Sequence, residues 1–284
     1  MKNKYWIFAL MSVVIWGVAS VLLRLTFDSF SSITLVTARV WLAAITMIII
    51  CRVKKLPPPR LRDFPIFLAG GAIGYAVYLV VQYIGFIYVT AATGNVVLAS
   101  TTLFTALIAL VVFREKIRPL GWLFSGVSFA GLLILVFWNG VLSINIGIVY
   151  HLIAALLFSG YCLIQRLMTQ RYTAIQCCAY SMTAGAIIMT PFLPDAIRDI
   201  AAAPPSAVVT FIYLGTIASG ISFTFWSKAF ALAKRTADVS NFLFLPPFVA
   251  SIVAYAFFGE LPDWGTVIGG VIIIFGLWMF QKKA

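Results

Sequence analysis

Arg39 stands inside the apolar run TLVTARVWLAAITMIII, and it is the first residue here whose chemistry calls for a partner. A charge in such surroundings is costly unless it faces another polar group or a water-filled space. The planar guanidinium carries a fork of donors that matches a carboxylate or a phosphate. Arg39 is therefore a candidate anion-binding group. Two structural alternatives stay open, namely that its side chain reaches the edge of the apolar layer or pairs with Asp28.

Tyr75, Tyr78 and Gln82 form a second candidate group on the run 66 to 88. Their spacing of i, i+3 and i+7 places them on one face of a helix. A tyrosine hydroxyl needs a hydrogen-bond partner, so this face is expected to line an interior, hydrated surface. Packing against partner hydroxyls on a neighbouring helix is the structural alternative.

Other polar or aromatic positions within apolar runs are weaker candidates. Trp16 lies near the middle of its run and could stack on a ring or a cation, or merely pack. Single polar residues within spans more typically form hydrogen bonds between helices than bind a ligand. The residues of this kind are Ser159, Tyr161, Gln165, Asn95 and Asn241.

His151 is the only histidine, and it could titrate as a proton carrier, although a lone histidine is more typical of a structural hydrogen bond. Glu115, Asp238 and Glu260 all lie near the ends of runs, so no acidic residue is deep enough to form a carboxylate proton relay or a sodium site. This pattern favours an uncoupled facilitator or a weakly coupled exchanger.

The elements that position these residues follow from composition, because 63% hydrophobic and 10% charged residues over 284 positions exclude a soluble globule. Runs of about 20 apolar residues are long enough to cross a bilayer as helices. Barrel strands would alternate apolar and polar positions instead. We therefore predict an all-α integral membrane protein with ten transmembrane helices, at 5–23, 33–51, 66–88, 93–113, 120–138, 145–165, 174–193, 207–227, 237–258 and 265–281.

The formal charge of +12 sorts by connection when these spans alternate in direction. Arg24 and Arg198 are the basic residues of one side, whereas the other side holds Lys2, Lys4, Arg52, Lys54, Lys55, Arg60, Arg62, Arg114, Lys116, Arg118, Arg166, Arg171, Lys228, Lys234, Arg235, Lys282 and Lys283. The positive-inside rule then predicts a multi-pass protein of the cell membrane with both termini cytoplasmic. Nucleic acid is not needed to explain the charge.

Several kinds of site are not indicated by the motifs. The four cysteines lack metal-ligand spacing and lie in or beside apolar runs, so neither zinc nor disulfides are expected. Nucleotide-binding and common hydrolase patterns are missing, so we expect no cofactor and no catalytic residues. The first run lacks a cleavage site, and we expect it to remain as a span.

The two halves of the sequence resemble each other. The segment 91–127 aligns with 236–271, so that Ala92 matches Ala237 and Glu115 matches Glu260, each at the end of an FxE triplet. Residues 1–141 and 142–284 are therefore predicted to be two repeats of five spans. Because five is odd, the second repeat is inverted, an arrangement typical of transporters with a site at the midplane. The span that matches 66–88 offers Ser219, Ser222, Phe223 and Trp226 as a facing wall.

Taken together, VIWG (14–17), LPPF (245–248) and the FxE triplets resemble the EamA-like branch of the drug/metabolite transporter superfamily, and the resemblance covers nearly the whole chain. It implies a basket of ten helices around a central cavity that carries small metabolites, often outward, amino acids among them. One departure concerns Pro246 and Pro247, because Thr101 and Thr102 stand at the matching positions of the first half. The resemblance therefore does not establish a helix kink there.

We expect a secondary transporter that moves a small amino-acid-like or aromatic solute by alternating access, export being the favoured direction. Its partners would be that small molecule and the lipid bilayer, and it would act as a monomer or a homodimer. A flippase holding a lipid-linked phosphate or sugar at Arg39 and an importer are the alternatives. An intramembrane enzyme would need paired acids, or a histidine with a nucleophile, deep in the spans, and this sequence shows neither. A purely structural protein would not explain the inverted halves. The predicted substrate-binding residues are Trp16, Arg39, Tyr75, Tyr78, Gln82, Asn95, Tyr161, Ser222, Trp226 and Asn241.

Overall fold

The computed structural model describes residues 4–26, 28–89, 91–115, 117–138, 146–259 and 264–283. Every regular element in these ranges is helical, and none of them contains a strand. The elements are α1 (Tyr5–Leu22), η1 (Leu23–Thr26), α2 (Ser32–Val53), η2 (Leu61–Asp63), α3 (Phe64–Gly71), η3 (Ala72–Val77), α4 (Tyr78–Tyr88), α5 (Ala91–Ala99), α6 (Thr101–Val112), α7 (Pro119–Phe137), α8 (Ile146–Met168), α9 (Ala174–Met189), η4 (Thr190–Phe192), α10 (Leu193–Ala202), α11 (Pro205–Gly215), η5 (Thr216–Ile221), α12 (Ser222–Leu232), α13 (Thr236–Ser240), η6 (Asn241–Phe244), α14 (Pro246–Phe258) and α15 (Trp264–Lys283).

Seven helical stretches of the described chain are long and apolar enough to cross a membrane: Tyr5–Leu22, Ser32–Val53, Leu61–Tyr88, Ile146–Met168, Ala174–Ala202, Pro205–Leu232 and Thr236–Phe257. Shorter apolar helices cover Val97–Val112, Pro119–Leu135 and Trp264–Phe280. The predicted all-helical membrane class is thus confirmed. The predicted boundary between the repeats and Glu260 lie outside the described residues.

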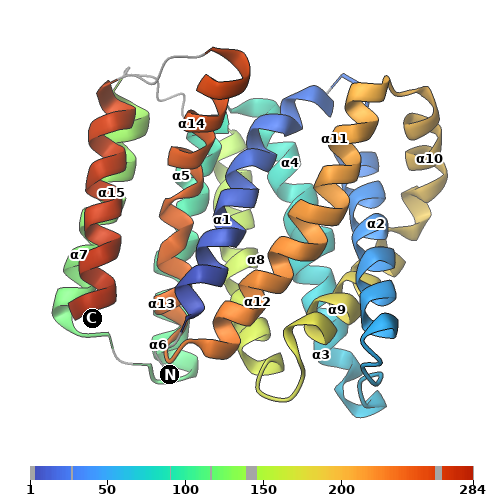
Figure 1. Cartoon of the computed structure of the whole chain (residues 1–284), viewed down its shortest axis with the longest axis horizontal. Helices are drawn as coiled ribbons and strands as arrows, with labels where there is room; N and C mark the ends of the chain where they lie inside the picture. Colours follow the sequence, from blue (N-terminus) through green and yellow to red (C-terminus); the bar gives the residue numbers. More distant parts are fainter. Residues whose placement is uncertain are drawn as a thin grey trace.

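The helices stand side by side and alternate in direction, and α1 begins on the same face of the molecule on which α15 ends (Figure 1). The connection from α2 to α3, with its lysines and arginines, reaches that face too. We call it the basic face. The opposite face carries α10, a short helix that the sequence analysis did not foresee.

At one side of the molecule α7 and α15 form a tightly packed pair (Figure 1). The two backbones approach closely because glycines remove the side chains between them. A Cβ atom added to Gly269 would lie 2.5 Å from the carbonyl oxygen of Gly131, and one added to Gly131 would lie 2.8 Å from that of Gly269. Small residues at such a crossing let membrane helices pack by van der Waals contact.

A valine at Gly269 is expected to lower the apparent melting temperature of the purified protein in detergent. The added side chain would overlap the Gly131 backbone, and overpacking of this kind costs about 1–3 kcal/mol. Gly126→Val on α7 is the matched control, because a Cβ there meets no atom within 4 Å. Equal melting temperatures for both variants would contradict the packing argument.

Two long helical stretches contain a π-helical segment in their middle, η3 between α3 and α4 and η5 between α11 and α12. Hydrogen bonds to i+5 in such segments disturb the regular pairing of backbone groups and often mark functional positions. At the end of η5, the backbone N–H of Ser222 bonds to the carbonyls of Ile217 and Ser219 rather than to that of Ala218. That carbonyl is thereby available to side chains.

The helix is interrupted in both halves at matching places. In the second half, η6 gives way to α14 at Pro246. In the first half, α5 ends at Ala99 and α6 begins at Thr101, although the sequence has no proline there. At the break, Ser100 bonds to the carbonyl of Val97 through both its backbone N–H (3.1 Å) and its hydroxyl (2.6 Å), which tightens the turn.

Candidate functional site

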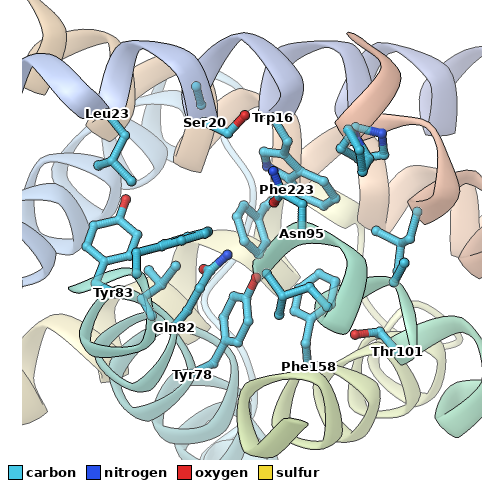
Figure 2. Close-up of a pocket in the computed structure, with 18 of the residues that line it drawn as sticks. Trp16, Ser20, Leu23, Tyr78, Gln82, Tyr83, Asn95, Thr101, Phe158 and Phe223 are labelled. Carbon is cyan, nitrogen blue, oxygen red and sulfur yellow. The ribbon is translucent and has the colours of Figure 1, made fainter. Parts of the chain in front are cut away.

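A pocket with an empty volume of about 790 Å³, part of it open to the surroundings, lies between the two halves of the chain. It extends from the middle of the molecule away from the basic face, because its lining runs from Trp16 to Leu23 on α1 and η1 and from Tyr78 to Phe86 on α4. Figure 2 shows side chains of α1 and α4 pointing toward each other across this space. The lining residues are Trp16, Ala19, Ser20, Leu23, Arg39, Tyr78, Leu79, Gln82, Tyr83, Phe86, Asn95, Leu98, Ala99, Thr101, Phe158, Phe223, Leu243, Pro246 and Pro247.

Arg39 is the only charged side chain among the described residues of this lining, and it is 5% exposed. Its Nε donates to Ser219 Oγ at 2.6 Å, and its Nη1 donates to the hydroxyl of Tyr83. Both partners are neutral. None of the ion pairs found among the described residues includes Arg39, so the pairing with Asp28 considered above is not present. The guanidinium therefore borders the pocket as a fixed positive charge, and no carboxylate of the described chain neutralises it.

Trp16 forms part of an aromatic wall of the pocket. Its Nε1 donates to the carbonyl of Ala218 at 3.0 Å, the group that the π-helical segment leaves available. Its ring centroid lies 5.0 Å from that of Phe223 and 5.9 Å from that of Phe158, both in edge-on geometry. The backbone irregularity of η5 thus fixes the orientation of this indole. Aromatic faces held in this way can bind a ring, an apolar chain or a cation.

Three further predicted residues line the same pocket from the first half of the chain. Tyr78 stacks on Phe158 with 4.8 Å between ring centroids. Gln82 and Asn95 add amide groups that face the hollow space in Figure 2. The pocket therefore combines one cation, neutral hydrogen-bonding groups and aromatic surface, a composition suited to a small amphipathic ligand.

The other five predicted residues lie outside the lining and are buried in the body of the protein. Two of them belong to a cluster on the side of the pocket toward the basic face, which we call the inner cluster (Tyr75, Tyr161, Gln165 and Ser227). Its members are joined by a hydrogen bond between the hydroxyls of Tyr75 and Tyr161 and by two bonds of 2.8 Å, from Gln165 Nε2 to Tyr161 and from Ser227 Oγ to Gln165 Oε1. This cluster fills the interior between the pocket and the basic face.

The remaining three are also buried. Ser222 donates to the Ala218 carbonyl at 2.5 Å, and the Asn241 amide bonds to the Ala237 carbonyl and to Ser125. Those bonds are local or join neighbouring helices. Trp226 is fully buried, with its ring centroid 5.2 Å from that of Trp16.

At the basic face, Glu115, Arg166 and Thr236 hold helix ends of the two halves together, and we call them the clasp. The Glu115 carboxylate accepts from the backbone N–H of Thr236 at 2.6 Å and from its hydroxyl at 2.9 Å. Arg166 lies 3.9 Å from the same carboxylate and donates to the carbonyls of Phe230, Ala233 and Lys234, each at 2.6 Å. Glu115 thus stabilises the beginning of α13, and Arg166 caps the end of α12.

His151 does not line the pocket. Its Nδ1 lies 2.8 Å from the carbonyl oxygen of Gly147, and its ring fits between Gly85 and Gly94 and against Phe86. Each glycine is needed there, because a Cβ at either position would approach a ring nitrogen to 2.5 Å. These contacts give the histidine a packing role between α4, α5 and α8.

A second hollow lies on the basic face and is lined by Arg60, Arg62, Asp63, Arg171 and Tyr172. Tyr172 donates to Asp63 Oδ2 at 2.5 Å, and its oxygen accepts from the backbone N–H of Arg60 at 3.2 Å. The hydrogen bond to the Asp63 carboxylate raises the pKa of the Tyr172 phenol. These bonds fasten the connection between α2 and α3 to the start of α9.

Sequence reasoning missed several residues of the pocket lining, notably Tyr83 and Phe158, whereas Phe223 belongs to the facing wall that it did predict. Tyr83 follows Gln82 directly, and its face of the helix was not considered because Tyr75, Tyr78 and Gln82 define another. Phe158 precedes Tyr161 by three residues, a spacing that places both on one side of α8. An aromatic stripe on that helix was the available signal.

Comparison with known proteins identifies the family to which the chain is similar. The profile of the EamA-like transporter family matches residues 3–137 and, a second time, residues 145–281. A "probable terminal-alkyne amino-acid exporter" from Streptantibioticus cattleyicolor is 28% identical over 96% of this chain and 92% of the relative. The "uncharacterized transporter YdfC" of Bacillus subtilis is 25% identical over 93% of this chain and 86% of its own.

Two further similarities are more limited. An "S-adenosylmethionine uptake transporter" from Rickettsia prowazekii is 29% identical over 64% of this chain and 60% of the relative. A crystal structure of another protein superposes with a TM-score of 0.80 over the full length of both chains at 15% sequence identity, which speaks to the fold alone. Since the family profile accounts for nearly every residue in two consecutive matches, the chain belongs to the EamA-like transporter family, whose members are multi-pass membrane transporters rather than enzymes.

Proposed function

We propose that this protein is a secondary transporter that carries a small amino-acid-like solute across the cell membrane by alternating access, with net movement outward when the cytoplasmic concentration is higher. The observation that carries this proposal is the uncompensated guanidinium of Arg39 at the edge of an aromatic pocket in a member of a transporter family. The basic face would be cytoplasmic, following the positive-inside rule.

In many carriers alternating access is a motion of two inverted halves, and several observations support this arrangement here. The π-helical segment η5 begins at Thr216, 144 residues after η3 begins at Ala72, and α12 likewise begins 144 residues after α4. The helix breaks before Thr101 and Pro246 are 145 residues apart. The contact of α4 with α8 is mirrored by that of α12 with α1. The family profile matches twice.

The clasp lies at the basic face, and the pocket extends from the middle of the molecule away from that face, which supports a carrier that faces one compartment at a time. The pocket is partly open, and its lining extends from the middle of α1 and α4 toward their ends away from the basic face. Toward the basic face, the inner cluster and the clasp are closed by direct hydrogen bonds. By the proposed topology this is an outward-facing arrangement. Opening the other end would need those bonds to break while the pocket closes.

A carboxylate is the group that best complements Arg39, because a guanidinium binds it through paired charge-assisted hydrogen bonds. The aromatic wall of Trp16, Tyr78 and Phe158 would hold the apolar part of the solute. The described lining contains no acidic residue, so an ammonium group would meet amide oxygens and ring faces instead. The amino acid and the S-adenosylmethionine in the names of two relatives both carry a carboxylate of this kind.

Transport by purified protein in liposomes tests the proposal. Phenylalanine, phenethylamine and 3-phenylpropionate share one ring and differ in whether they carry the carboxylate, the amine or both. We expect protein-dependent flux of the two carboxylates and none of phenethylamine. Flux of phenethylamine alone, or no difference from empty vesicles across a broad panel of amino acids, would contradict it.

A further inference from the structure

Five buried side-chain polar atoms of the described chain lack hydrogen-bond partners: Nε1 of Trp41, Oγ1 of Thr105, Nε2 of His151, Nε1 of Trp226 and Oγ of Ser240. Two of these groups belong to Trp226 and Ser240, both with an exposed fraction of 0%. Trp226 interacts with the sulfur of Cys162, which is only a weak acceptor. An unpaired N–H or O–H is rare in a protein interior and calls for an explanation. Both groups lie on the side of the pocket floor toward the basic face.

The correspondence between the halves gives these groups a common origin. The 144-residue register of the π-helical segments relates Gln82 to Trp226. The 145-residue register of the helix breaks relates Asn95 to Ser240. Gln82 and Asn95 are the two amide side chains that line the open pocket. The two unpartnered groups therefore occupy the positions that would line an equivalent pocket on the side of the molecule toward the basic face.

We infer that the closed part of the protein toward the basic face contains a second solute pocket, built around Trp226 and Ser240, which we call the inner pocket. It opens when the carrier exposes its solute site at the basic face. This inference rests on the proposed alternating access. Following the 144-residue register, further lining would come from Ser222, Ser227 and Phe230, the counterparts of Tyr78, Tyr83 and Phe86. Phe223 and Leu243 line the present pocket and are the counterparts of Leu79 and Leu98, so they would border both pockets.

The second pocket differs from the first in charge. The hydroxyl of Ser31 caps the start of α2, and the hydroxyl of Thr173 caps the start of α9. When the two helices are aligned at these caps, Arg39 on α2 corresponds to Ser181 on α9. The residues assigned to the inner pocket therefore supply hydroxyl and indole donors but no cation. An indole N–H can only donate, so its ligand atom must be an acceptor, such as a carboxylate oxygen. The same solute would be held on this side by neutral hydrogen bonds, and more weakly than at Arg39.

Opening this pocket requires a specific change in contacts. Ser227 now donates to Gln165 Oε1, and Trp226 packs against Trp16 and Phe230. Release of the clasp would let the end of α12 move away from α8 and uncover these side chains. The unpaired N–H and O–H would then gain partners from water or solute, which favours the open state and offsets the loss of the inner cluster.

The test uses the full chain in liposomes and measures the phenylalanine concentration that half-saturates transport. Phenylalanine is added either at the basic face or at the opposite face, which we call the pocket face. Trp226→Phe and Ser240→Ala each remove one donor without adding bulk. We expect each to raise the half-saturating concentration from the basic face about fivefold, the effect of one hydrogen bond, and to change the value from the pocket face less than about twofold. Trp41→Phe is the matched control, because its buried Nε1 is also unpartnered but belongs to neither register.

A second measurement does not depend on transport rates. In Ser240→Cys the new thiol should react with a membrane-impermeant reagent added from the basic face, and phenylalanine should slow the reaction. The four native cysteines are buried and give the background in the parent protein. Equal effects from both faces, effects no larger than those of Trp41→Phe, or an unreactive thiol in a Ser240→Cys protein that still transports would overturn the inference. Absence of transport by the parent would instead overturn the proposed function.

Discussion

Arg39→Gln is expected to raise the dissociation constant for a carboxylate solute roughly ten- to 150-fold, the range that corresponds to a hydrogen bond with a charged group. Glutamine can replace one neutral contact of Arg39 but supplies no charge. The solute carboxylate would then enter a pocket whose described lining holds no other cation. Isothermal titration or a ligand-induced thermal shift of the purified protein measures this change.

Stability separates this outcome from misfolding. Within the described chain the buried charge of Arg39 has no carboxylate partner, and its hydrogen bonds go to Ser219 and Tyr83. We therefore expect the ligand-free melting temperature of Arg39→Gln to equal or exceed that of the parent, because residues that serve binding are often kept at the expense of stability. Arg39→Lys is the control that retains charge but not the fork of donors. Unchanged affinity in Arg39→Gln would exclude Arg39 as the anion-binding group.

Glu115→Ala is expected to release the closed end of the molecule. The substitution leaves the N–H and hydroxyl of Thr236 without their acceptor and removes the carboxylate near Arg166. Loss of these partly buried contacts costs about 2 kcal/mol, which shifts a two-state equilibrium about 30-fold toward the state open at the basic face. Solute binding from the pocket face weakens accordingly, because fewer molecules present that pocket.

Hydrogen–deuterium exchange of the α13 backbone measures this release directly. Exchange should accelerate in Glu115→Ala and less so in Glu115→Gln, which keeps one acceptor oxygen. Asp195→Asn is the matched control, because its ion pair with Arg198 is exposed and such pairs contribute little. Unchanged protection of α13 in Glu115→Ala would show that the clasp does not hold this end closed.

The position of Arg39 beside the pocket could be predicted from the sequence, because a charge in apolar surroundings is costly unless it faces a polar group or a water-filled space. The separation of Tyr75 from Tyr78 does not follow. Regular helical spacing puts the two on one face, but Tyr75 lies within the π-helical segment η3 and Tyr78 begins α4 after it. The wider turn rotates one against the other, so that Tyr75 meets Tyr161 whereas Tyr78 faces the pocket.

Other features were hidden because their causes are local hydrogen bonds or distant partners. The break between α5 and α6 depends on how Ser100 bonds to Val97, and no proline announces it. Ser219 becomes the partner of Arg39 only through the packing of η5 against α2. Pairings of this kind depend on how neighbouring helices are rotated and shifted, which the composition of each apolar run does not encode.

The polar contacts of the first half have a consequence for biogenesis. Arg39 bonds to Ser219, 180 residues later, and Trp16 bonds to the Ala218 carbonyl, 202 residues later. At about 5–20 residues per second the ribosome needs roughly 10–40 seconds to deliver these acceptors. Before then, of the two acceptors of Arg39, only Tyr83, 44 residues after it, has been made. We therefore expect this span to stay beside the translocon rather than to enter the lipid early.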